Sequence, residues 1–134
     1  MTNKRFPIAK VVGFLAFTSL ALLSLPAQAI PNATVVVVNG GTVIRSTSVA
    51  SVAVVTGTDR HKSYIECYFE TDTGQVGLHL VSKDQRRIEA LYQQIVTSST
   101  GIGFQITAYV SSTYQTDGYV ANLESDLVYL LLGS

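Results

Sequence analysis

The chain has 134 residues, a formal net charge of zero and a single cysteine. A chain of this length suffices for one domain with a modest hydrophobic core. One cysteine excludes an internal disulfide, so no cross-link within the chain stabilises the fold.

The first 29 residues have the three features of a secretory signal peptide. Basic side chains come first, an apolar run extends from Val11 to Leu25, and a small-x-small triplet ends at Ala29. The run has about 15 residues, fewer than the roughly 20 that a transmembrane helix needs. We therefore expect cleavage after Ala29, a signal peptide over residues 1–29, and a secreted or periplasmic protein that consists of one domain over residues 30–134.

Cleavage changes the charge of the chain. Three of the nine basic residues leave with the signal peptide and all nine acidic residues stay, so the mature chain carries a charge of −3. Such a chain lacks the basic field that attracts phosphate backbones, and nucleic-acid binding is not expected. Later apolar runs are too short to span a bilayer, so no membrane span is expected in the mature chain.

The segment before residue 82 has the pattern of antiparallel strands. Two β-branched runs, 33–38 and 42–55, flank the turn sequence Asn39-Gly40-Gly41. Residues 64–70 alternate in polarity, a turn is predicted at 71–74, and residues 75–81 alternate again. This pattern predicts four strands ahead of the helix.

One amphipathic helix is predicted within residues 82–101. Its apolar residues recur at helical spacing and form one stripe, which consists of Ile88, Leu91, Tyr92, Ile95 and Val96. Ser82 is the expected N-cap, with Gln85 as its capping-box partner, and the helix is expected to stop before Gly101. The stripe predicts that the helix packs against a sheet.

Two further strands follow the helix. The first, within residues 103–112, alternates strictly, and the second extends from Tyr119 to Leu132. The second strand places Ala121, Leu123, Leu127, Tyr129 and Leu131 on one face, whereas Val128, Leu130 and Leu132 make its other face apolar at the end. A chain end that is apolar on both faces is either deep in a sheet or covered by another subunit. A homo-oligomer in which the helices or final strands meet is therefore one of the expected assemblies.

The element order predicts a mainly β fold of the α+β type. Five or six strands with one helix before the last two strands are typical of a small OB-like antiparallel barrel. The segments "YIECYFETDTG" and "SKDQRRIEALYQQIVTSSTGIGFQITAYVSSTYQTDGYVANLESDLVYLLL" resemble the pattern of secreted bacterial toxin B subunits of the subtilase-cytotoxin and pertussis-like kind, and of related periplasmic proteins. The resemblance implies an OB fold that binds a ligand. Members commonly pair cysteines across the last hairpin, and "SSTYQTDGY" contains none.

Cys67 lies in the alternating run "YIECYFE" on the same face as Ile65 and Phe69. The favoured interpretation is a small buried side chain in a strand. The alternatives are an intermolecular disulfide and a catalytic thiol, and a catalytic thiol would need His61 or His79 as its base.

The sequence contains no catalytic or metal-binding motif that we can identify. Neither histidine has Cys, Asp or Glu at a ligand spacing, and neither a nucleophile elbow nor a phosphate-binding loop is present. We therefore expect no enzymatic activity, no metal and no cofactor. A small hydrolase whose site is not visible in the sequence is the competing hypothesis.

The aromatic side chains of the predicted last hairpin are the candidate ligand site. Tyrosine rings beside short polar groups can stack on sugars or peptides while the polar groups donate and accept hydrogen bonds. The tentative ligand-binding residues are Tyr109, Tyr114, Gln115, Asp117 and Tyr119. The alternative is that tyrosine is simply a good strand residue. The expected function is a binding module for a glycan, peptide or protein partner, and the alternative is a periplasmic inhibitor or envelope-stress protein that acts by protein contact.

Overall fold

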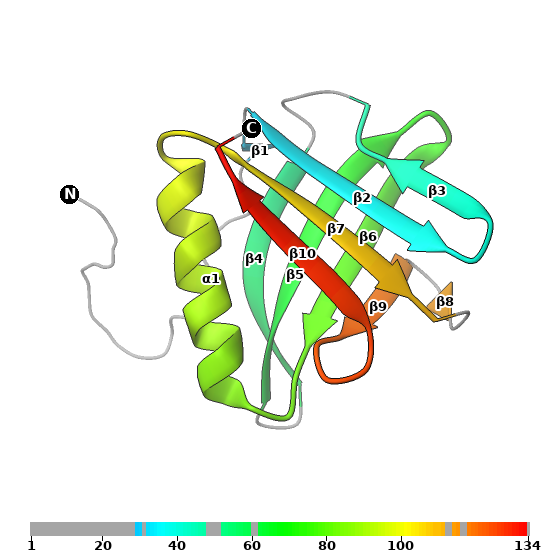
Figure 1. Ribbon diagram of the computed structural model, residues 1–134. Helices are drawn as coiled ribbons and strands as arrows, with labels where there is room; N and C mark the ends of the chain where they lie inside the picture. The colour runs from blue at the N-terminus through cyan, green and yellow to red at the C-terminus, as the bar shows by residue number, and fades with distance from the viewer. Residues whose placement is uncertain are drawn as a thin grey trace.

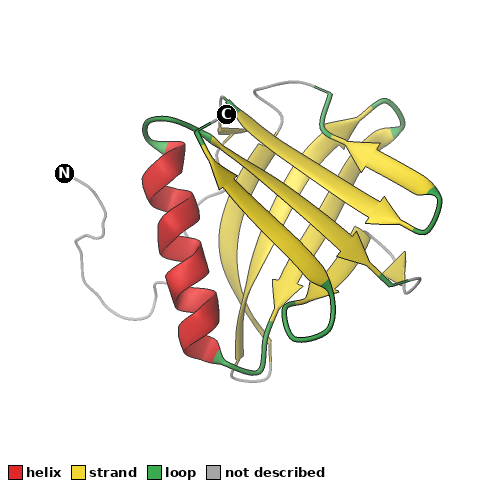
Figure 2. Cartoon of the chain, viewed as in Figure 1, coloured by secondary structure: helices red, strands yellow, loops and turns green. Residues whose placement is uncertain are grey.

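The computed structural model describes residues 29–30, 32–47, 52–59, 62–111, 114–115 and 118–133, without the side chains of Ala29, Asp59, Tyr114 and Gln115. In these residues ten strands and one helix are present (Figure 1). The strands form two sheets that enclose one core, and the helix lies beside them (Figure 2). The expectation of a mainly β fold with one helix is confirmed. The predicted signal peptide lies outside the described residues, apart from Ala29.

The larger sheet has six strands in the order β1-β4-β5-β6-β9-β8. Their bounds are Ala29–Ile30 for β1, Val52–Asp59 for β4, Lys62–Thr71 for β5, Gly74–Val81 for β6, Gly118–Asn122 for β9 and Tyr114–Gln115 for β8. Strands β4, β5 and β6 form an antiparallel meander. The run 42–55, predicted as one strand, is divided between Thr42–Arg45 in the other sheet and β4 in this one. Strand β9 then pairs with β6 in parallel, which is the arrangement that a crossover through the helix allows.

The smaller sheet has four strands in the order β10-β7-β2-β3. Their bounds are Leu127–Leu132 for β10, Phe104–Val110 for β7, Ala33–Asn39 for β2 and Thr42–Arg45 for β3. The hairpin predicted around Asn39-Gly40-Gly41 is confirmed, with Asn39 paired to Thr42 and Gly40 at a φ of 62°. Strand β2 pairs in parallel with β7, although the whole meander and the helix lie between these two strands in the sequence.

The core lies between the sheets and is filled by the alternate side chains of the strands. Its largest fully buried members are Phe69, Ile65, Leu78, Leu80 and Val52 from the six-stranded sheet, Val35, Val37, Phe104 and Ile106 from the four-stranded sheet, and Ile88 and Ile95 from the helix. Alternation places every second residue of a strand on the same face, so these residues share one apolar layer. Cys67 is fully buried in this layer, which confirms the favoured interpretation of its position.

Helix α1 spans Gln85–Ser99 and packs its apolar stripe on the core, as the sequence predicts. Ile88 and Ile95 are buried, and Leu91 and Tyr92 are half-buried against the core. The predicted N-cap is wrong. Asp84 has the extended backbone of a cap and its carboxylate accepts a hydrogen bond from the backbone N–H of Arg86, because Ser82 lies two residues further from the helix and bonds elsewhere.

The predicted last strand is divided between the two sheets. Residues 118–122 form β9 and residues 127–132 form β10, and a tight turn at 123–126 separates them. The turn is stabilised by side chains: Asn122 Oδ1 accepts from the Glu124 N–H at 2.9 Å, and Asp126 Oδ2 accepts from the Asn122 N–H at 2.8 Å. These Asx-type bonds offer the backbone an alternative to a continuous strand ladder.

The closed barrel of five or six strands is not confirmed. Within the described residues the strands belong to two separate hydrogen-bonded sheets, and the edges of the smaller one are β10 and β3. The division at 123–126 also reverses the apolar faces. Ala121 and Leu123 point into the core, but Leu127 and Tyr129 point away from it, and Val128 and Leu130 face the core instead.

Candidate functional site

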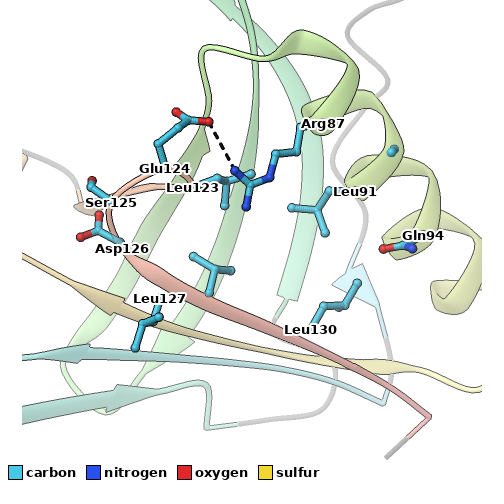
Figure 3. A pocket seen from close by; sticks show the side chains of 11 residues that line it. Arg87, Leu91, Gln94, Leu123, Glu124, Ser125, Asp126, Leu127 and Leu130 are labelled. Carbon is cyan, nitrogen blue, oxygen red and sulfur yellow. Dashed lines mark hydrogen bonds and ion pairs between the residues drawn. The ribbon is translucent and has the colours of Figure 1, made fainter.

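A groove lies between helix α1 and strand β10 (Figure 3). Its volume is about 500 Å³, and it is open to the surface. One wall comes from the helix and the other from β10 and the turn before it. Its lining residues are Arg87, Ala90, Leu91 and Gln94 from the helix, and Leu123, Glu124, Ser125, Asp126, Leu127, Val128 and Leu130 from the other wall.

The groove combines an apolar floor with a polar end. Leu91 projects from the helix toward the space above Leu130, and Leu123 is buried behind them. Arg87 and Glu124 lie together at the end nearest the 123–126 turn, in which Asp126 lies beside Ser125 (Figure 3). A floor of this kind binds apolar side chains of a ligand. The polar end can donate hydrogen bonds to the backbone of the ligand and accept hydrogen bonds from it.

Hydrogen bonds to the Glu124 side chain connect the turn at the polar end with the start of the helix. Its carboxylate accepts hydrogen bonds from the Ser82 hydroxyl and from the Lys83 backbone N–H at 3.1 Å, and Arg87 Nη1 lies 3.4 Å away. The Ser82 hydrogen bond is the main cause that lowers the pKa of Glu124, followed by the Lys83 N–H, and the Arg87 charge adds a smaller effect. These contacts hold the two walls of the groove at one end.

Strand β10 presents a backbone edge to the groove. It pairs with β7 on one side, from Leu127 opposite Tyr109 to Leu132 opposite Phe104. On its other side no strand of the described part of the chain is paired with it. A sheet edge of this kind exposes alternate N–H and C=O groups, which can pair with an added strand.

A second polar cluster lies on the outward face of the six-stranded sheet. Glu66 is buried at 8% exposure; its carboxylate accepts a hydrogen bond from the Tyr68 hydroxyl and lies within hydrogen-bonding distance of His79 Nε2. The Tyr64 ring stacks on His79 with 4.8 Å between centroids. The side chains of Glu66, Tyr68 and His79 are thus joined by hydrogen bonds across β5 and β6, and the arrangement fits a network that stabilises this hairpin.

Sequence reasoning missed the Glu66–His79 pair, although a signal for it is present. The turn predicted at 71–74 sets the register of the β5–β6 hairpin, in which Glu66 lies directly opposite His79. Counting outward from that turn along both strands places the two residues opposite each other from the sequence alone. His61 lies outside the described residues.

The tentative ligand-binding residues are distributed over both sheets. Tyr109 is on β7, exposed on the outer side of the four-stranded sheet, and its ring packs edge-on against Tyr129 with centroids 6.1 Å apart. Tyr114 and Gln115 form β8, in which Tyr114 pairs with Tyr119 of β9. Tyr119 is half-buried and packs against the core. Asp117 lies outside the described residues.

The described residues contain no group of three or more His, Cys, Asp and Glu side chains placed to hold a metal ion. Among them there is also no helix with the length and apolar character that a membrane crossing requires.

No protein-family model matches the chain, and neither a curated protein nor a solved structure shows a significant similarity to it.

Proposed function

We propose that this chain is a secreted or periplasmic binding module that recognises an extended segment of a protein partner in the groove between α1 and β10. The observation that supports the proposal best is the backbone edge of β10 that pairs with no strand of the described residues and lies beside an apolar floor. The signal-peptide pattern of residues 1–29 supports the location.

The proposed recognition is strand addition. A partner segment that pairs with β10 makes main-chain hydrogen bonds along the free edge, and every second side chain turns toward the floor around Leu91, Leu123 and Leu130. The main-chain bonds supply affinity for any extended segment, and the floor selects apolar side chains at alternate positions. The preferred ligand is therefore a short segment of alternating apolar residues without proline at the paired positions.

The test is selection from a displayed random-peptide library on residues 30–134, followed by binding measurements with the selected peptides. Gln94→Trp should abolish binding because the indole fills the groove, whereas Gln93→Trp, one residue along the same helix but outside the lining, should not change it. Both positions are exposed, so neither substitution disturbs the core. Equal binding by the two variants would remove the groove from the site.

The same peptides also test the hairpin site predicted at Tyr109, Tyr114, Gln115, Asp117 and Tyr119. Alanine at Tyr114 and Tyr119 should leave binding unchanged if the groove is the site, and should weaken it if the hairpin is. Glycans bound by the wild-type chain but lost only in the Tyr114 and Tyr119 variants would assign a sugar ligand to the hairpin instead.

Two related functions predict different partners. An envelope inhibitor that acts by protein contact would co-purify with an envelope enzyme, and its binding would be lost in Gln94→Trp. An OB-type toxin B subunit would form a ring in solution and bind glycans. The solution mass of residues 30–134 separates the ring from the other assemblies.

A further inference from the structure

The outward face of the four-stranded sheet is almost free of charge. The register of the four strands places eleven side chains on it, which we call the outer face: Leu127, Tyr129 and Leu131 of β10, Gln105, Thr107 and Tyr109 of β7, Thr34, Val36 and Val38 of β2, and Val43 and Arg45 of β3. Only Arg45 among them carries a charge. Sheets with one solvated face normally alternate apolar and polar residues, and this sheet does not.

Five apolar side chains of the outer face are exposed, whereas Val36 near its middle is buried at 4% exposure. Tyr109, Tyr129, Leu131, Val43 and Leu127 have exposed fractions between 44% and 60%. The paired rows Leu127–Tyr109–Val38–Val43 and Tyr129–Thr107–Val36 bring them side by side across the strands. Contiguous apolar surface of this kind on a small domain marks an interaction site.

We propose that the outer face is the interface between two copies of this chain, which stack their four-stranded sheets about a two-fold axis that runs along the strands between β7 and β2. A chain end that is apolar on both faces is either deep in a sheet or covered by another subunit. Strand β10 lies at the edge of its sheet and its outer residues are exposed, so the first alternative does not hold in the described residues.

The distribution of charge favours a second copy over a strongly charged partner. The mature chain has a charge of −3, yet none of the eleven outer-face residues is acidic. A basic partner would therefore meet no negative charge on the outer face. A two-fold interface places the same surface of each copy against the other, and like charges near its centre would repel. The outer face avoids this repulsion, because a two-fold axis through its centre places the two Arg45 side chains on opposite rims.

The size of the outer face sets the expected affinity. Four strands about 4.8 Å apart and six residues of about 3.4 Å each give a projected area on the order of 400 Å² per copy. This is the size of weak, transient interfaces, so we expect a dimer with a dissociation constant in the micromolar range. The outer face shares Leu127 with the α1–β10 groove, and the other lining residues of the groove lie outside the outer face.

The test is the solution mass of residues 30–134 by light scattering after size exclusion, over concentrations from about 1 to 200 µM. The wild-type chain should become dimeric with increasing concentration. Tyr129→Lys and Leu131→Lys should each raise the dissociation constant about tenfold or more, because dimerisation would bury two uncompensated charges. Ile102→Lys changes an apolar side chain of similar exposure, 63%, outside the outer face, and should leave the dimer intact.

Three results would overturn the proposal: a wild-type monomer at the highest concentration, a ring of about five copies, or a dimer that both lysine variants retain. Circular dichroism establishes that each variant is folded before its mass is interpreted. Failure here is distinguishable from failure of the proposed function. If Tyr129→Lys is folded and monomeric and still binds the selected peptides, the dimer interface is disrupted and the groove remains the proposed binding site. If Gln94→Trp is dimeric and binds no peptide, the groove is blocked and the proposed interface remains.

Discussion

Gly118 lies directly against the backbone of Gly77, its partner in the parallel pairing of β9 with β6. A Cβ atom on Gly118 would lie 2.1 Å from the Gly77 carbonyl oxygen, and the φ angle of Gly118 is 156°. No backbone atom at that distance can move aside without disturbing the strand pair. This contact allows β9 to join the larger sheet and so positions the turn that ends the groove.

Gly118→Ala should lower the free energy of unfolding by about 2–4 kcal/mol, because the methyl group must displace the β6 backbone. Urea unfolding measures the loss. Gly41→Ala is the matched control: its Cβ would meet nothing within 4 Å, so the change should be within about 0.5 kcal/mol of zero. Similar losses at both positions would show that the close approach to Gly77 is not the cause.

The stability of the protein should fall between about pH 9 and 12 through Cys67. Burial, with a smaller effect of the Glu66 carboxylate, raises the pKa of the thiol from 9.0 to about 12. Above pH 9 the unfolded chain releases the thiol proton and the native chain keeps it, so the free energy of unfolding decreases with pH. Urea unfolding at pH 7, 9 and 10.5 measures this decrease.

The Cys67→Ala variant isolates the contribution of the thiol. It should be less stable at pH 7 because it leaves a cavity, but its stability should fall less steeply above pH 9. Burial also raises the pKa of Tyr92, which adds a decrease that both proteins share. Parallel pH dependences in the two proteins would contradict the assignment to Cys67.

Ser82→Ala should raise the pKa of Glu124 toward the ordinary value of 4.5, because the Ser82 hydroxyl is the principal group that stabilises its carboxylate. Carbon-detected NMR titration of the glutamate carboxyl groups measures the change. The lowered pKa of Glu124 stabilises the fold above pH 4.5, and this contribution disappears as the pH falls through the native pKa. Ser125→Ala, in the exposed turn beside Glu124, should leave the titration unchanged.

Asp84→Ala should destabilise the protein by about 1 kcal/mol, since it leaves the Arg86 backbone N–H without its capping carboxylate. Asp84→Asn retains an oxygen acceptor and should cost much less. Thermal unfolding of the two variants gives the comparison. If Asn and Ala are equally destabilising, the negative charge of Asp84 and not its cap geometry is responsible.

Expression of the full chain in a bacterium with export machinery should yield a mature protein that begins at Ile30, as measured by intact mass. In β1, Ala29 pairs with Ala53 and Ile30 with Val52, so cleavage after Ala29 removes the first of these pairs and leaves the second. Ala29→Arg should leave the precursor uncleaved because the small residue before the cut is lost, and Ile30→Val should be processed normally. A wild-type product that retains residues 1–29 would contradict the signal peptide.

Local periodicity is sufficient to predict many of the elements. The β2–β3 hairpin, strands β5 and β6 and the apolar stripe of α1 follow from alternation, helical spacing and turn residues, which are short-range properties. Alternation did not show that the run 42–55 is divided between β3 and β4, which lie in different sheets. The burial of Cys67 follows in the same way, because a residue between two core positions of a strand shares their face. Periodicity could not identify the N-cap, since Ser82 and Asp84 are both good capping residues.

Short-range patterns in the sequence are enough to specify a mainly β domain with one amphipathic helix, because those patterns repeat over a few residues. Long-range contacts alone determine that the chain leaves the larger sheet at Leu123–Asp126 and enters the smaller one at β10. That change of sheet reverses which side chains face the core, exposes Leu127 and Tyr129, and leaves one edge of β10 beside the helix. Such features depend on residues far apart in the chain, and alternation along one strand cannot show which face the rest of the protein covers.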